Sequence, residues 1–329
     1  MLVSNVFVFY RWNNMSTNRQ LPLLPGHPAT VDDLNRQTPL QATVALFQEH
    51  LRKEGKSDHT IKAFTSDLLL LADYSDGTTP IGHYTTTLLN EFLHWMEHER
   101  GVPCSRKTYA RRVTTLKVYF KWLHELGAIT SDPAKAVLQR SGPAPLPVIL
   151  SPTEVRHAIM GARMMTRGEV LDTRPELLFR LLLNTGIKKN ETMRLTPSDI
   201  DRSNPSMPIL TVRYKVRNVF KERRVKLDPD WLGLFDAYMA QYRPDGTIFN
   251  CTARNLEYIL ADIGEQAGIP VKISFEMLRW TSAVLDYREG VDPEAIREKL
   301  GLSPTSWHET FNKIKQLTAR QLAQESGGH

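Results

Sequence analysis

Cysteine is scarce in this chain of 329 residues: only Cys104 and Cys251 occur, and they form no CxxC pair. A fold held together by disulfide bonds and a cysteine-based zinc site are therefore excluded, and the usage is that of a reduced protein. The ten histidines show no spacing typical of metal ligands. We therefore expect no metal ion and no other cofactor.

Long apolar runs are also missing. No stretch approaches the roughly 18 apolar residues that a helix needs to cross a membrane. Residues 2–10 are apolar but lack the basic start and the small-residue cleavage site of a signal peptide. We therefore expect no membrane partner and a cytoplasmic protein, associated with the nucleoid if the source is a bacterium or an archaeon.

The remaining composition is that of an ordinary globular protein, with 41% hydrophobic and 24% charged residues. The length suffices for two domains. A formal net charge of +6 and an isoelectric point near 9.2 favour a polyanionic partner. Charge alone fits equally well with a basic enzyme that never meets nucleic acid.

Polar and proline-rich stretches divide the chain. Residues 1–38 have no hydrophobic period and are predicted to form a flexible arm. Residues 39–140 carry four amphipathic helical patterns and are predicted to form a helical domain. Residues 141–147 include three prolines in five residues, which is typical of a semi-rigid linker. A second domain is therefore expected over residues 148–329.

The second domain is predicted to be mostly helical with one hairpin. Its strands are expected at residues 209–214 and 223–227, with a turn between them. Helical patterns cover residues 175–184, 230–242, 252–267, 275–287, 293–299 and 305–324. The predicted fold class is therefore mainly α with a small antiparallel β-sheet, in two domains.

Three short segments of the second domain occur in a specific order. They are Thr185–Glu191, which reads TGIKKNE, Ser274–Trp280, which reads SFEMLRW, and Leu300–Leu302, which reads LGL and precedes Phe311 by nine residues. In these segments the chain resembles the tyrosine recombinase (phage integrase) family, of Xer type. The resemblance covers roughly residues 40–325. It implies a helical, SAM-like core-binding domain and a catalytic-type domain that together clamp duplex DNA.

The resemblance also identifies five positions at which the family's cutting chemistry needs particular side chains. Its first arginine is here Lys188, its first histidine Glu276, its second histidine Leu302 and its tyrosine nucleophile Phe311, whereas Arg279 keeps the family residue. The family mechanism implies a tyrosine oxygen that attacks a DNA phosphate held by two arginines. Phenylalanine has no such oxygen, and a lysine lacks the paired donors of an arginine. We therefore expect a degenerate member without enzymatic activity.

Two basic surfaces are predicted to contact DNA. One lies on the fourth helix of the first domain, opposite its apolar face, and the other surrounds the turn of the hairpin. With two positions from the motifs, the predicted DNA-binding residues are Arg106, Lys107, Arg111, Lys117, Lys121, Lys188, Lys215, Arg217, Lys221, Arg223 and Arg279. The family lysine of the hairpin corresponds to Lys215 or to Lys221. A solvated surface without a ligand is the alternative interpretation of both basic runs.

One acidic and one aromatic position, Glu276 and Tyr287, complete the predicted site. A carboxylate at Glu276 would repel a phosphate unless a cation neutralised it. Because Glu276 and Arg279 are three residues apart on an expected helix, we predict that they form an ion pair, with Lys188 in the same network. Tyr287, the last tyrosine of the chain, is better explained as a half-buried core residue than as a displaced nucleophile.

The leading hypothesis is a DNA-binding protein with a tyrosine recombinase fold that clamps duplex DNA without cutting it, in a regulatory or architectural role. Its expected partners are double-stranded DNA and, in addition, a second copy of the chain or an active recombinase. Two alternatives stay open: an active recombinase or integrase with an unorthodox site, and a helical protein-interaction module that has lost DNA binding.

Overall fold

The chain folds into two compact units, Met1–Ala144 and Pro145–His329. The computed structural model describes residues 28–102, 104–138, 145–216 and 219–326. The division between the units falls inside residues 141–147, where the sequence predicts a linker. Most of the predicted arm lies outside the described residues, but Val31–Asp33 form the short helix η1 and Leu34 is buried in the first unit. The arm therefore ends before residue 38, because Leu34 contributes to the core.

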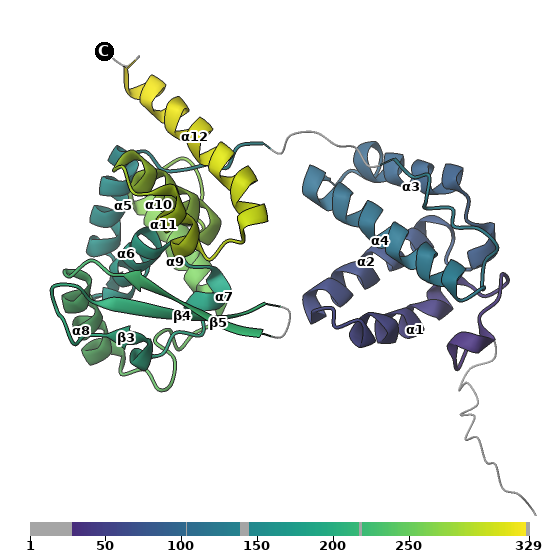
Figure 1. Cartoon of the computed structure of the whole chain (residues 1–329), viewed down its shortest axis with the longest axis horizontal. Coiled ribbons are helices and arrows are strands. Elements are labelled where there is room, and N and C mark those ends of the chain that lie inside the picture. Colours follow the sequence, from purple (N-terminus) through teal and green to yellow (C-terminus); the bar gives the residue numbers. More distant parts are fainter. Residues whose placement is uncertain (1–27, 103, 139–144, 217–218, 327–329) are drawn as a thin grey trace, which may run out of the picture. The chain divides into compact units, whose positions relative to one another are not determined.

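The described part of the first unit contains four α-helices (Figure 1). They are α1 (Leu40–Lys53), α2 (Asp58–Tyr74), α3 (Thr86–His98) and α4 (Arg106–Glu125), with the short helix η2 (Ile81–His83) before α3. Ser57, Thr85 and Ser105 each accept a hydrogen bond from a backbone N–H in the first turn of the helix that follows. Each side chain thereby satisfies a donor that the helix itself leaves unpaired. The four helical patterns of the sequence are confirmed.

Aromatic side chains of α1 and α4 form the centre of the first unit. The ring centroids of Phe47, Tyr119 and Trp122 lie between 5.2 and 6.0 Å apart. The hydroxyl of Tyr119 lies 2.6 Å from that of Thr43, which satisfies a phenol that is completely buried. More than one face of α4 is therefore buried, and its basic residues are confined to the remaining side.

The second unit packs helices around a small sheet (Figure 1). Its described helices are α5 (Pro152–Met164), α6 (Thr173–Thr185), α7 (Lys189–Thr192), η3 (Pro197–Asp199), α8 (Trp231–Tyr242), α9 (Ala253–Gln266), α10 (Phe275–Arg288), α11 (Pro293–Leu300) and α12 (Pro304–Ser326). Its described strands are β1 (Thr166–Arg167), β2 (Val170–Leu171), β3 (Ile200–Asp201), β4 (Ile209–Val216) and β5 (Val219–Lys226). The predicted fold class is confirmed. None of the helices in the described ranges is long and apolar enough to cross a bilayer.

The sheet of the second unit is antiparallel throughout, with the strand order β3-β4-β5, and β1 pairs with β2 in a separate hairpin. Leu210, Val212 and Val225 are buried and attach the β4–β5 hairpin to the core. The two strands pair from Ile209 and Lys226 as far as Val216 and Val219. The hairpin is thus longer than predicted, because backbone pairing continues where the alternation of apolar residues has stopped.

Two glycines bring the first and third motifs together. Gly186, which follows α6, has a φ of 58°, and Gly301, which follows α11, has a φ of 61°. A Cβ at Gly186 would lie 2.9 Å from Leu300 Cδ2, and a Cβ at Gly301 would lie 2.9 Å from Arg223 Nη1. Only glycine combines this backbone conformation with such close approach, so the two helix ends lie against each other.

Helix α12 packs on its own unit. Ile314 and Leu317 are buried in a small core with residues of α10 and α11. Farther along, Gln321 donates a hydrogen bond of 3.1 Å to the carbonyl of Leu150, and Arg288 forms an ion pair of 2.8 Å with Glu325. These contacts fix the position of the segment that carries Phe311.

Candidate nucleic-acid interface

Arg279 links the ends of two helices. It lies in the first half of α10, a helix that is capped by the Ser274 side chain. Its Nη1 donates to the carbonyl of Gly186, and its Nη2 donates to the carbonyl of Leu300 at 2.6 Å. Burial lowers the pKa of Arg279 to about 10, an effect that Glu191 opposes. The guanidinium is therefore still charged at neutral pH.

Arg223 was predicted to contact DNA, but its side chain is buried in an ion pair with Glu191. Its Nη1 and Nη2 donate to the two carboxylate oxygens at 3.0 and 2.7 Å, and its Nε donates to the carbonyl of Lys299 at 2.8 Å. The side chains of Arg223 and Glu191 are only 7% and 3% exposed. The reason is strand alternation, because Arg223 lies on the same inward face of β5 as Val225.

The charge of Arg223 keeps Glu191 ionised. Burial acts to raise the pKa of Glu191, but the hydrogen bonds and the positive charge of Arg223 outweigh it, so that the pKa lies below its ordinary value. Glu191 also accepts a hydrogen bond of 2.8 Å from the backbone N–H of Lys188, which closes the first turn of α7. The Glu191–Arg223 pair therefore connects β5, α7 and the end of α11.

Lys188 brings a third cation to this place. It directly precedes α7 and is an exposed residue. Its pKa is lowered, first by loss of water around its ammonium group and then by the charges of Arg279 and Arg223, whereas Glu191 acts to raise it. Lys188, Arg223 and Arg279 together with Glu191 are called the cationic cluster below. Its excess of positive charge suits an anionic group such as a phosphate.

The predicted ion pair between Glu276 and Arg279 is wrong. Glu276 is exposed at the start of α10 and forms no ion pair within the described ranges. The guanidinium of Arg279 is directed to the carbonyl oxygens of Gly186 and Leu300 instead. Sequence spacing permitted the pair, but the two helix ends supply closer acceptors. The acid that acts on Lys188 and Arg279 is Glu191, which was not predicted from the sequence.

Phe311 belongs to an aromatic group in the first half of α12. Its ring is stacked on that of Trp307 at a centroid distance of 5.2 Å. The ring of Tyr287 meets it edge-on at 5.5 Å. Lys315 Nζ lies 5.0 Å from the centroid of the Phe311 ring. Phe311 is therefore held by packing, and Tyr287 is the half-buried packing residue that the sequence predicts.

Leu302 has a packing role as well. Its side chain is half-buried against the small core formed by α10, α11 and α12. Its carbonyl accepts a hydrogen bond of 2.6 Å from Arg297 Nη1, which fixes the turn between α11 and α12. An aliphatic side chain at this position offers no donor to a ligand.

The basic residues predicted on α4 differ in their surroundings. Arg106, Lys107 and Lys121 are exposed, and Lys117 is half-buried. Lys121 Nζ lies 3.5 Å from a carboxylate oxygen of Glu125, one turn away. Such an exposed pair restrains the lysine only weakly. These residues therefore keep positive charge on the solvent side of α4.

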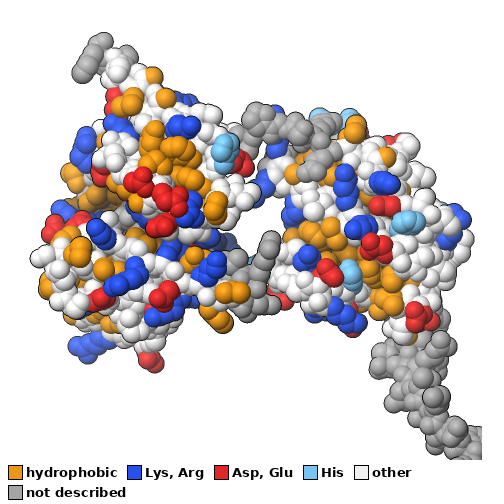
Figure 2. All heavy atoms as spheres, in the orientation of Figure 1, with side chains coloured by type: hydrophobic (Ala, Val, Ile, Leu, Met, Phe, Trp, Pro, Cys, Tyr) orange, Lys and Arg blue, Asp and Glu red, His pale blue; other side chains and the backbone are white. Residues whose placement is uncertain are grey.

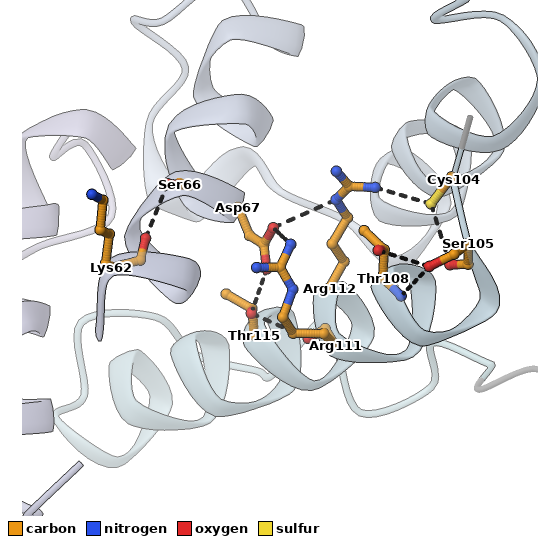
Figure 3. A network of polar contacts seen from close by, with 9 residues as sticks. All are labelled: Lys62, Ser66, Asp67, Cys104, Ser105, Thr108, Arg111, Arg112 and Thr115. Carbon is orange, nitrogen blue, oxygen red and sulfur yellow. Dashed lines mark hydrogen bonds and ion pairs between the residues drawn. The ribbon is translucent and has the colours of Figure 1, made fainter. Parts of the chain in front are cut away.

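Arg111 joins α4 to α2. Its Nη2 donates to Asp67 at 2.8 Å, and Thr115 donates to the other oxygen of the same carboxylate at 2.9 Å (Figure 3). Arg112 Nε lies 3.5 Å from Asp67, and its Nη1 donates to Cys104 Sγ at 3.0 Å. Burial raises the pKa of Asp67, against the opposing effects of Thr115 and both arginines. Arg111 is thus anchored, and the sequence analysis missed the buried acid that anchors it.

The hairpin residues lie on two faces of β4 and β5. Lys221 is exposed, whereas Arg217 lies outside the described residues, and only the backbone position of Lys215, opposite Phe220, is described. Because side chains alternate along a strand, Lys221 shares a face with Arg223 of the cationic cluster. The register therefore favours Lys221 over Lys215 as the counterpart of the family lysine.

Comparisons with known proteins agree with this geometry. Residues 44–127 match the family model of the phage integrase, N-terminal SAM-like domain. The tyrosine recombinase XerC of Mycobacterium sp. (strain JLS) is 26% identical over 294 residues, which cover 86% of this chain and 97% of the relative. XerC of Mycobacterium tuberculosis (strain ATCC 25177 / H37Ra) is 29% identical over 183 residues, which cover 55% of this chain and 60% of the relative.

Solved structures share the fold at lower identity. The site-specific recombinase XerH, in a post-cleavage complex with palindromic difH substrate, superposes with a TM-score of 0.68 at 18% identity, over 88% of this chain and 84% of that one. A lambda integrase dimer bound to a COC′ core site gives a TM-score of 0.64 at 15% identity, over 83% and 77% of the two chains.

The SAM-like helical unit and the mostly helical second unit with its three-stranded sheet have the fold of tyrosine recombinases. Within that class, the match over nearly the full length of XerC gives the closer assignment. Its first unit thus matches the N-terminal domain of phage integrases, and most of its length is similar to Xer-type tyrosine recombinases.

Proposed function

We propose that this protein binds duplex DNA and does not cleave it, as a regulatory or architectural member of its family. The observation that supports the proposal most directly is Phe311. By the resemblance of the sequence, Phe311 occupies the position of the family's attacking tyrosine, and its ring packs against Trp307 and Tyr287. A benzene ring offers no oxygen to attack a phosphate, whatever charges surround it.

The changes around Phe311 point in the same direction. Lys188 supplies a single ammonium where the family has a planar fork that holds two phosphate oxygens. Leu302 offers no donor where the family has a histidine, and exposed Glu276 adds negative charge near the same helix ends. The loss of the nucleophile is thus accompanied by the loss of groups that would stabilise charge in the transition state.

The cationic cluster supports binding. An arginine has five N–H donors, and Arg279 directs two of its nitrogens to carbonyl oxygens within the described structure. Its remaining donors and the Lys188 ammonium group match the oxygens of a DNA phosphate. The exposed cations of α4 and Lys221 add further positive charge on each unit. Relatives such as XerH and lambda integrase have been solved as DNA complexes, which supports the same partner here.

The binding half of the proposal is tested by fluorescence anisotropy. A labelled random duplex is titrated with the full chain at several salt concentrations. With about 30 base pairs, log affinity should fall linearly with log salt, at a slope of about −0.9 for each phosphate contacted. Absence of binding at low salt would refute DNA binding and would favour a protein-interaction module.

The cleavage half is tested with nicked duplexes that trap a covalent protein–DNA adduct. The wild-type chain and its Phe311→Tyr variant are incubated with such duplexes and analysed on denaturing gels. We expect no adduct from the wild type. A wild-type adduct that disappears in a Tyr287→Phe variant would refute inactivity and would identify Tyr287 as the nucleophile.

The chain's further partner is proposed to be a second protomer on the same DNA, either a copy of itself or an active recombinase. The dimeric state of lambda integrase on its core site supports this arrangement. Sedimentation of the chain with and without duplex DNA measures it. Strictly monomeric complexes at saturating protein would refute self-association.

A further inference from the structure

Phe220 is the most exposed large hydrophobic residue in the described part of the chain, at 80%. Val219 beside it is 57% exposed. Single exposed apolar residues are common on protein surfaces. Exposure alone therefore says little. The position of Phe220 and the charges around it are more informative.

Phe220 is held on a rigid element. It lies in β5 opposite position 215 of β4, one residue from the last described pair of the hairpin, Val216 and Val219. Leu210 and Val225 anchor the other end of the two strands in the core. In Figure 1 the free end of this hairpin projects from the second unit. The aromatic ring is thus presented to solvent by a paired strand.

The surroundings of Phe220 are strongly basic. Residues 213–226 contain seven lysines and arginines and one acid, Glu222. Arg213 and Arg224 are held by Asp199 and Asp201 at the base of the sheet, whereas Lys221 lies next to Phe220 and is exposed. Figure 2 shows hydrophobic and basic side chains together at this end of the second unit.

An aromatic ring surrounded by cations matches the chemistry of duplex DNA. Stacked bases offer an apolar surface, and the phosphates on both sides offer negative charge. Proteins that bind DNA grooves insert apolar side chains between base steps and thereby unstack and bend the duplex. A partner with a neutral apolar surface would leave the exposed Lys221 beside Phe220 without a counterpart.

We propose that Phe220 is a wedge that inserts between base pairs and bends the bound DNA, while Lys221, on the other face of β5, contacts a phosphate of the same duplex. This inference rests on the proposed DNA-binding function and specifies how that binding occurs. The wedge needs no particular base, because every base has a face on which an aromatic ring can stack.

The test compares three variants of the full chain with the wild type. Phe220→Ala removes the wedge, Phe220→Trp keeps an aromatic ring, and Val170→Ala alters an exposed apolar residue, 62% exposed, on the separate β1–β2 hairpin. Because all these side chains are exposed, folding should be unaffected, and circular dichroism verifies this. The readouts are anisotropy, energy transfer between the two labelled ends of the duplex, and permanganate reactivity of unstacked thymines.

We expect the wild type and Phe220→Trp to bend the duplex and to make thymines reactive. Phe220→Ala should abolish both signals and weaken binding about tenfold, with an unchanged salt slope, because no phosphate contact is lost. Val170→Ala should behave as the wild type. Binding by the wild type without bending or reactivity, or equal signals from Phe220→Ala, would overturn the wedge alone. Absence of any salt-dependent binding would overturn the DNA-binding function itself.

Discussion

The buried ion pair between Glu191 and Arg223 allows a quantitative prediction of how the stability of the second unit changes when its acid is removed. In the Glu191→Gln variant the side chain keeps its shape but loses its negative charge. Arg223, Lys188 and Arg279 then lie together without an acid among them. The variant should therefore be destabilised by repulsion between cations as well as by weaker hydrogen bonds.

The magnitude follows from the burial of the pair. Glu191 accepts two charge-assisted hydrogen bonds, at 2.7 and 3.0 Å, and both side chains are more than nine-tenths buried. Removing one partner of such a pair costs about 3–5 kcal/mol, because an uncompensated charge stays buried. Replacing both partners with apolar residues should cost less, so Glu191→Leu combined with Arg223→Met should be more stable than either single variant.

Urea unfolding measures the effect, with hydrogen exchange and mass spectrometry used to follow the second unit separately. The matched control is Glu309→Gln, which removes an acid that is 75% exposed from its pair of 2.6 Å with Lys313. We expect no measurable change from the control, because exposed pairs contribute little. If Glu191→Gln were as stable as Glu309→Gln, the role assigned to the cationic cluster in folding would be refuted.

The same pair determines a pH dependence. The pKa of Glu191 in the folded protein lies below its ordinary value of 4.5. A lowered pKa means that the carboxylate stabilises the fold fully above that ordinary value and that this stability is lost as the pH falls through the folded pKa. Glu191→Gln should remove this part of the acid sensitivity. Identical acid unfolding of wild type and variant would contradict the assignment.

Three further predictions concern other parts of the chain. Gly186→Ala should lower the unfolding free energy of the second unit by more than about 1 kcal/mol, because a Cβ would lie 2.9 Å from Leu300 Cδ2. Gly168→Ala has a similar φ and no neighbour within 4 Å, so calorimetry should give it the smaller loss. Lys221→Ala should reduce the salt slope of DNA binding by about 0.9, and an equal reduction in Lys215→Ala would contradict the assignment from the register. Because burial raises the pKa of Asp67, the first unit should gain stability as the pH falls through that pKa, and Asp67→Asn should abolish the gain in acid titrations followed by calorimetry.

The sequence predicted elements whose signals are local. Ser57 and Ser105 identify the starts of α2 and α4, because a serine before an apolar period offers its oxygen to the first turn. The order of the three motifs identified the family, and Gly186 and Gly301 mark helix ends that only glycine allows. These features depend on a few neighbouring residues, so one sequence is enough to find them.

The sequence predicted the partners of charged residues poorly, since those partners are distant along the chain. Arg223 was interpreted as part of a basic run, although its alternation with Val225 and Leu227 is a signal of an inward face. Asp67 lies three residues after Phe64, on the apolar stripe of α2, and this position was a signal of a buried acid. Neither signal reveals the partner, which lies 32 residues away for Arg223 and 44 residues away for Asp67 and Arg111.

The two carbonyl oxygens that accept hydrogen bonds from Arg279 bear on how such chains evolve. The last carbonyls of a helix have no partner within it, and one arginine here satisfies Gly186 after α6 and Leu300 at the end of α11. Folding alone therefore favours this arginine, whether or not the chain cuts DNA. The presence of this arginine in a distant relative is consequently no sign of activity. The residue at the position of Phe311 is the more informative one, because cleavage needs a tyrosine oxygen there.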